Sequence, residues 1–317
     1  MLTDADDRRH ELRPGPLSRE SLIFLLFLPE ENLGAIAYTW VDGESVAGSM
    51  ITVFGPDDER FVHHVVQGVG MDPAADFDDW RVGPLHVRHG APHQRARVTF
   101  DHEGVSLDYR FEAINKAFSY HDNADGCPAF LADDRLEQSG LVTGTLTIGD
   151  RRIEFDTTGH RDHSWGTRDW TAFHHYKWVN VQAAKKDGAA DIAVNFMHGL
   201  AMDRQYELGY VHRDGEQSPI ASIEADLERD DEFYAYTSAR FVVTDEKGRV
   251  TEIETGNRTS LIVWPAGGLV SRDAASTCTV AGRPGIVHVE EGWVPEFVEH
   301  RLASAAKRRL EQAGMGE

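Results

Sequence analysis

The sequence is poor in cysteine. Its 317 residues include only Cys127 and Cys278, which lie far apart and form no CxxC pair. A disulfide framework is therefore excluded as the basis of the fold, and we expect both thiols to be reduced.

Basic residues are also scarce. Asp and Glu number 53 against 32 Lys and Arg, which gives a formal net charge of −21. Such a chain repels a phosphate backbone and an anionic membrane surface, so the composition predicts no nucleic-acid partner. An uncharged apolar ligand remains compatible with this charge.

Long apolar runs are missing as well. The longest, "SLIFLLFLP", has about half the length of a membrane span and ends at Pro29, so we expect a buried strand and no stable membrane insertion. The polar start "MLTDADDRRHELRPGP" has no apolar core of a secretory signal. The sequence therefore predicts a cytoplasmic protein.

The chain instead contains many short apolar or alternating runs separated by turn residues, such as "GAIAYTWV", "DGE" and "VAGSMITVF". The same rhythm returns in the second half, in "YKWVNVQAA" and "IVHVEEGW". This pattern predicts an all-β fold of barrels or sandwiches. We place a domain boundary between residues 1–158 and 159–317.

One helix is expected, over residues 295–314. Pro295 suits its first turn and Gly314 its C-terminal cap. Its apolar stripe predicts packing against a barrel and consists of Val298, Leu302, Ala305, Ala306 and Leu310.

Residues 159–170, "GHRDHSWGTRDW", concentrate ionisable and aromatic side chains. The preceding "RRIEFDTT" alternates, which places Ile153 and Phe155 on its buried face. If the strand continues in phase, His163 and Trp165 share that face and Asp162 points the opposite way. A bulge at Gly159 would reverse this assignment.

Three interpretations of the segment compete. A metal site is disfavoured, because His160, Asp162 and His163 do not all project to one side of a strand, although His174, His175 or His198 could complete a ligand set. We therefore predict no metal. A Ser-His-Asp triad is weaker still, because Ser164 lacks the GxSxG elbow.

The third interpretation is structural, because buried charged groups satisfy one another. It assigns Arg161, Arg168 and Asp169 a supporting role, with Asp162 paired to Arg161 or Arg168. His163 and Trp165 are expected to line a pocket.

The segment "GHRDHSWGTRDW", preceded by "LDYRFEA" and "RLEQSGLVTGTLTIGDRRIEFD", resembles the carotenoid hydratase (hydroxyneurosporene synthase) and AttH-like superfamily. The resemblance implies two calycin-like, lipocalin-related β-barrels with this segment near their junction. It also implies cofactor-free, non-redox chemistry on apolar substrates, namely hydration of isoprenoid or prenyl double bonds or, in fungal relatives, pericyclic reactions.

Carried over by residue, the resemblance assigns His163 and Trp165 to the active site. It also implies a Tyr-x-Asp, whose nearest match is Ala189-Ala190-Asp191. The Tyr is absent, so Tyr176, Tyr206 or Tyr210 is the candidate replacement.

Protonating an alkene needs a carboxylic acid held neutral by burial, for which Asp191 and Asp162 are the candidates. Trp165 would stabilise the cation and His163 would handle water or the proton. Trp178, Tyr176 and Phe155 are expected to contact the substrate.

The sequence thus predicts a hydro-lyase or isomerase of a hydrophobic alkene. A non-catalytic carrier of an apolar ligand and a cyclase or pericyclase are the alternatives. A homodimer is left open.

Overall fold

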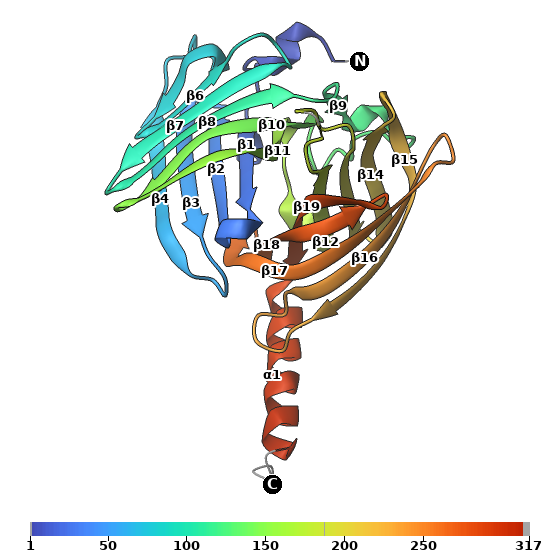
Figure 1. Ribbon diagram of the computed structural model, residues 1–317. Helices are drawn as coiled ribbons and strands as arrows, with labels where there is room; N and C mark the ends of the chain where they lie inside the picture. The colour runs from blue at the N-terminus through green and yellow to red at the C-terminus, as the bar shows by residue number, and fades with distance from the viewer. Residues whose placement is uncertain (1, 187, 313–317) are drawn as a thin grey trace.

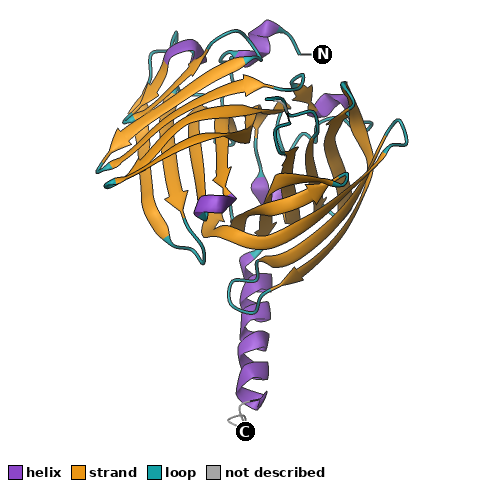
Figure 2. Ribbon diagram, in the orientation of Figure 1, coloured by secondary structure: helices purple, strands orange, loops and turns teal. Residues whose placement is uncertain are grey.

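The computed structural model describes residues 2–186 and 188–312, and its regular elements are almost all strands (Figures 1 and 2). Two sheets follow one another along the chain. The all-β prediction is therefore confirmed.

The first sheet contains eleven strands in the order β4-β3-β2-β1-β11-β10-β8-β7-β6-β5, with β9 paired to β10. Its strands are β1 (Ser18–Leu28), β2 (Leu33–Asp42), β3 (Val46–Phe54), β4 (Arg60–Gly70), β5 (Trp80–Val82), β6 (Leu85–His89), β7 (Arg95–His102), β8 (Val105–Ala113), β9 (Phe118–Ser119), β10 (Asp134–Ile148) and β11 (Arg151–Thr167). The sheet curves into a barrel whose end strands, β4 and β5, are not paired with each other.

The second sheet is a closed eight-stranded barrel of antiparallel neighbours, sealed by the pairing of its first and last strands. Its strands are β12 (Phe173–Ala183), β13 (Ala193–Ala201), β14 (Arg204–Arg213), β15 (Glu216–Arg229), β16 (Tyr236–Asp245), β17 (Val250–Ala266), β18 (Leu269–Val280) and β19 (Arg283–Trp293).

The apolar run in β1 is explained by burial on both faces. Leu22 and Phe24 belong to the core inside the first barrel, whereas Leu25 and Phe27 belong to a second core that includes residues of β12, β13 and β14. A strand covered on both sides loses the alternation of a half-exposed strand. The two barrels therefore share an apolar interface.

The boundary predicted after residue 158 is wrong, because it falls inside β11. This strand pairs with β1 and β10 without a break as far as Thr167, and the second barrel begins at Phe173. The polar motif is therefore part of the first sheet, and the connection between the two barrels is the short segment 168–172.

The helix α1 (Pro295–Gln312) projects away from both barrels in Figure 1. Only Val298 and Ala305 are buried along it, and Leu310 is 49% exposed. The predicted packing of the whole apolar stripe is therefore wrong for its distal half. Among the described residues, no helix has both the length and the apolar character needed to cross a membrane.

Removing the distal half of α1 should cost little stability. Deletion of residues 306–317 should change the free energy of unfolding by no more than about 0.5 kcal/mol, because the two buried side chains of the helix, Val298 and Ala305, both remain. Val298→Ala, which truncates a buried side chain, should cost about 1 to 3 kcal/mol. Urea unfolding measures both; a larger loss from the deletion than from Val298→Ala would contradict this description.

Candidate functional site between the two barrels

Strand β11 presents different chemistry on its two faces. Gly159 pairs with Gly140 in an unbroken register, so no bulge changes the phase of the strand. His163 accordingly lies on the same side as Phe155, inside the first barrel, where its ring meets Phe77 edge-on at 5.3 Å. His160 lies on the opposite side, where its ring contacts Trp178 of β12 at 5.8 Å.

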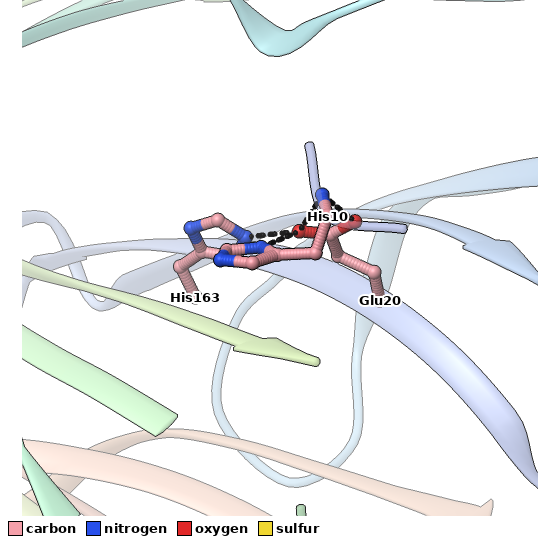
Figure 3. Close-up of side chains that lie close together, drawn as sticks. All are labelled: His10, Glu20 and His163. Carbon is pink, nitrogen blue, oxygen red and sulfur yellow. Dashed lines mark hydrogen bonds and ion pairs between the residues drawn. The ribbon is translucent and has the colours of Figure 1, made fainter. Parts of the chain in front are cut away.

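Inside the first barrel, Glu20 bridges two histidines (Figure 3). Its Oε1 atom lies 2.7 Å from His10 Nδ1 and 2.7 Å from His163 Nε2. Trp165 stacks on His10 with ring centroids 3.8 Å apart. His163 and Trp165 therefore lie on the inward face, as predicted, where His10 of the N-terminal segment packs against both rings.

His10, Glu20 and His163 form a group that could hold a metal ion. Donor atoms of His10, Glu20 and His163 all lie within 4.8 Å of one another. Burial alone would raise the pKa of Glu20, but the hydrogen bonds from both histidines lower it. The carboxylate is thus already satisfied by the two rings, and the absence of a metal stays a prediction.

Purified protein should carry less than one equivalent of transition metal, because each donor nitrogen that faces Glu20 already has a hydrogen-bond partner. Elemental analysis by mass spectrometry measures this. A full equivalent in the wild type that disappears in Glu20→Gln would contradict the prediction and identify this trio as the ligands.

On the opposite face of β10 and β11, Arg135 binds two carboxylates. Its Nε donates to Glu137 Oε1 at 2.6 Å, and its Nη2 donates to Asp162 Oδ2 at 2.5 Å. The three side chains are all nearly inaccessible to solvent. Because buried charges must be paired, this arginine fixes the position of both acids.

Glu137 has further partners in both barrels. The Tyr120 hydroxyl and the Trp178 indole each donate to Oε1 at 3.0 Å, and His160 Nε2 lies 2.7 Å from Oε2. Burial alone would raise the pKa of Glu137, but Arg135 and His160 lower it. This carboxylate is therefore held ionised and fully hydrogen-bonded, which suits a structural role.

The surroundings of Asp162 have the opposite effect on its pKa. Burial raises its pKa to about 7, against the opposing influence of Arg135, and the nearby negative charge of Glu137 adds to the increase. Its other oxygen lies 3.5 Å from the Ser164 hydroxyl, which also accepts a hydrogen bond from Arg168. Asp162 is therefore a carboxylic acid with a substantial protonated fraction near neutral pH.

The predicted partners of Asp162 are corrected by this geometry. Arg135 of β10 pairs with it, while Arg161 lies on the other face and binds Asp7 and Gln138. Adjacent side chains on a strand point to opposite faces, so Arg161 could not reach Asp162.

The second barrel brings two more acids to the same interface. Glu290 of β19 and Asp273 of β18 are register neighbours that share a hydrogen bond, and burial raises the pKa of each to about 7. Tyr176 donates to Glu290, and His288 Nε2 lies 3.1 Å from Asp273. Two carboxyls this close favour sharing one proton.

A cleft of about 480 Å³ opens between the barrels next to this network. Trp40, Arg19, Arg168 and Trp170 are among its lining residues. Tyr38 stands beside it, with the Arg19 guanidinium 5.4 Å from its ring. Burial alone would raise the pKa of Tyr38, but Arg19 and Arg168 lower it.

Other predicted site residues lie apart from the cleft. Asp191 is exposed and paired with Arg283, whose hydrogen bond lowers the pKa of the Asp191 carboxyl. It is therefore no buried acid, and that prediction is wrong. Phe155 belongs to the core of the first barrel. Asp169, by contrast, lines the cleft and accepts hydrogen bonds from Thr171 at the start of a 3-10 helix.

Sequence reasoning missed Arg135, Glu137, Glu290 and Tyr38. A usable signal existed for two of them, because Glu137 and Glu290 interrupt runs that read as strands, in "RLEQSGLV" and "IVHVEEGW". A charged residue within a buried strand needs a partner, and that partner marks a site. Nothing in the local sequence distinguished Tyr38.

Glu290→Gln should stabilise the protein progressively as pH rises. A carboxyl whose pKa is raised in the folded state favours folding only while protonated, so wild-type stability is lost between the ordinary value of 4.5 and about 7. The neutral amide has no such loss and still accepts from Tyr176. Urea unfolding from about pH 5 to about pH 8 measures the difference; a gap between variant and wild type that stays constant with pH would refute the shift.

Sequence and structure comparisons relate this architecture to known proteins. The family model described as "Domain of unknown function (DUF7064)" matches residues 3–295. A search of curated proteins gave no match.

Solved structures share the fold at low sequence identity. A Nitrosomonas europaea protein provisionally named AttH has a TM-score of 0.58 at 13% identity, covering 87% of this chain and 92% of that one. CghA in complex with Sch210972 has a TM-score of 0.61 at 11% identity, covering 88% and 89%. Kievitone hydratase from Nectria haematococca has a TM-score of 0.57 at 10% identity, covering 87% and 89%. The fold expected from the motif is thereby confirmed.

Proposed function

This chain belongs to the DUF7064 family, and from that premise and its fold we propose that it is an enzyme that hydrates, dehydrates or isomerises a C=C bond of a hydrophobic small molecule. We propose isoprenoid or prenylated compounds as the substrate class. The reaction uses acid catalysis at the cleft between the barrels. The name of kievitone hydratase supports this reaction class by analogy only.

The observation that carries the proposal is the state of Asp162. Its pKa of about 7 leaves a proton available near neutral pH, and its position is fixed by Arg135. Ser164 connects it to Arg168, which lines the cleft. An ordinary structural carboxylate would instead resemble Glu137, which is ionised and saturated with donors.

Tyr38 completes the route in this proposal. The Ser21 hydroxyl lies 3.4 Å from that of Ser164, and Tyr38 hydrogen-bonds to Ser21. Tyr38 delivers the proton to one alkene carbon, whose π electrons form the new C–H bond, and Asp162 replaces that proton through the two serines. Water then adds to the cation and gives up a proton, which returns through Tyr38 and the two serines to the Asp162 carboxylate. In an isomerisation, a carbon next to the cation gives up its proton by the same route instead.

His163 and Trp165 face the interior of the first barrel, away from Asp162, so the proposal gives them a positioning role. Trp40 and Trp170 take over the task of stabilising the cation, because both line the cleft and indole rings attract cations. Trp178 and Tyr176 hold Glu137 and Glu290 in place.

The partner in this proposal is a hydrophobic small molecule. The acidic, cysteine-poor composition supports the expected cytoplasmic location. A homodimer remains a prediction without a described interface.

The decisive experiment is turnover in deuterated water. Comparing metabolites of a knockout with those of its parent strain identifies the compound that accumulates, which then serves as substrate. A hydration or isomerisation places deuterium on a substrate carbon, because the catalytic proton exchanges with solvent, whereas a dehydration is recognised by loss of one water from the substrate. Conversion with neither labelling nor loss of water would instead indicate a pericyclase, and binding without conversion a carrier.

Asp162→Asn and Tyr38→Phe should each lower the rate of labelling by about 100-fold or more, the usual contribution of a general acid. Asp156→Asn, at an exposed position on the same face of the same strand, is the matched control and should turn over normally. Asp191→Asn should also retain labelling. Loss of labelling in Asp191→Asn with retention in Asp162→Asn would reverse our assignment.

A further inference from the structure

Two arginines in the cleft lack carboxylate partners. Among residues 2–186 and 188–312, no ion pair joins Arg19 or Arg168 to an acidic side chain, although acidic residues outnumber basic ones 53 to 32. In so acidic a protein, most arginines are expected to have an acidic partner, so an arginine without one beside a cleft is unusual. It needs an explanation in terms of what the cleft binds.

Arg19 is held by aromatic rings. Its guanidinium carbon lies 4.5 Å from the ring centroid of Trp40 and 5.4 Å from that of Tyr38. Its Nε is buried and has no hydrogen-bond partner among the described residues. Stacking fixes the plane of the guanidinium and leaves its donors available.

Arg168 directs its donors to neutral oxygens. Its Nη1 donates to the Ser21 hydroxyl at 3.0 Å, and its Nη2 donates to the Ser164 hydroxyl. Neither contact is with a carboxylate, and Asp162 acts on the Arg168 charge only through space, without an ion pair. Two guanidiniums that repel each other at one site cost stability unless a ligand supplies negative charge.

The carboxylates closest to the cleft are engaged elsewhere. Asp42 and Asp169 both line it. Asp42 accepts hydrogen bonds from the backbone of Glu44 and Val46, and Asp169 accepts from Thr171. Both acids therefore stabilise turns at the rim and leave the arginines free.

We infer that Arg19 and Arg168 form a binding site for an anionic oxygen group of the ligand, a carboxylate or a delocalised enolate, with the apolar remainder of the ligand against Trp40 and Trp170. A planar anion matches the fork of donors that a guanidinium presents. The cleft volume of about 480 Å³ suits a small molecule carrying such a group.

This inference rests on the proposed function for its choice of site and adds the substrate class: an apolar alkene that bears an acidic oxygen group. The anion would also offset the two positive charges next to which the proposed carbocation forms. A neutral terpene would leave both guanidiniums uncompensated beside that cation.

The test compares two probes with the same apolar body, pyrenebutyrate and pyrenebutanol. Energy transfer from tryptophan to pyrene reports binding, since Trp40 and Trp170 line the cleft. At low ionic strength and about pH 7.5, the wild type should bind the carboxylate at least about tenfold more tightly than the alcohol, the ratio expected for a charge-assisted hydrogen bond.

Arg19→Gln and Arg168→Gln should each reduce this preference about tenfold or abolish it, while affinity for pyrenebutanol stays within about twofold. Arg19→Gln is the cleaner variant, since the Arg19 Nε has no hydrogen-bond partner in the described part of the chain. Arg204→Gln, an exposed arginine outside the cleft, is the control and should retain the preference. Arg19→Lys should restore it only in part, because an ammonium lacks the planar fork.

Equal affinity of the wild type for both probes, or an unchanged preference in Arg19→Gln, would overturn the inference. An equal loss of both probes in Arg19→Gln would overturn it too, by showing that the arginine acts as apolar wall. Because the assay involves no turnover, it separates the two proposals. A protein that prefers the carboxylate but never labels substrate refutes only the hydratase proposal, and the reverse result refutes only the anion site.

Discussion

Arg135 is the side chain on which the interface between the barrels depends. It lies in a nearly dry interior and contacts Glu137 and Asp162 directly. Arg135 and the two acids can be buried only together, because an unpaired buried ion costs about 3 to 5 kcal/mol. One arginine shared between two acids leaves a surplus negative charge, and a raised pKa at one acid relieves it. Asp162 is the acid whose pKa rises.

The same constraint explains why β11 carries so many charged residues. Its two faces look into two different interiors, so each charge must find a partner within its own interior. Arg161 and His163 meet Asp7 and Glu20 inside the first barrel. Asp162 meets Arg135 between the barrels, where the second barrel adds Glu290 and Asp273. The charged groups inside the first barrel are paired with one another, whereas the interface retains acids that favour a proton and adjoins a cleft. Chemistry is therefore assigned to the interface.

Much of the fold could be predicted from the sequence, because strand alternation and turn residues are local signals. The phase of β11 followed from Ile153 and Phe155 alone. The boundary between the sheets could not be predicted, since continuation of β11 past Gly159 depends on pairing with β1, more than 130 residues earlier. The resemblance indicated the right fold, yet Asp191 was placed wrongly. Its surroundings depend on Arg283 of β19, which no local pattern indicates.

The acids of the interface show the same limit. Asp162 was recognised as a candidate, but its partner, its pKa and its distance from the cleft depend on β10, β19 and the segment after β11. Tyr38 is a candidate only because the fold brings Arg19 and Arg168 beside it. A pKa shift arises from burial and neighbouring charge together, and both are properties of the assembled fold.

The central claim is that burial between the barrels keeps Asp162 partly protonated near neutral pH. Infrared difference spectra between the wild type and Asp162→Asn, recorded from about pH 5 to about pH 9, follow the carbonyl stretch of the protonated acid. The account predicts that this band belongs to Asp162 and disappears with a midpoint of about 7. A band that is already absent at about pH 5, where an ordinary aspartate is ionised, would contradict it.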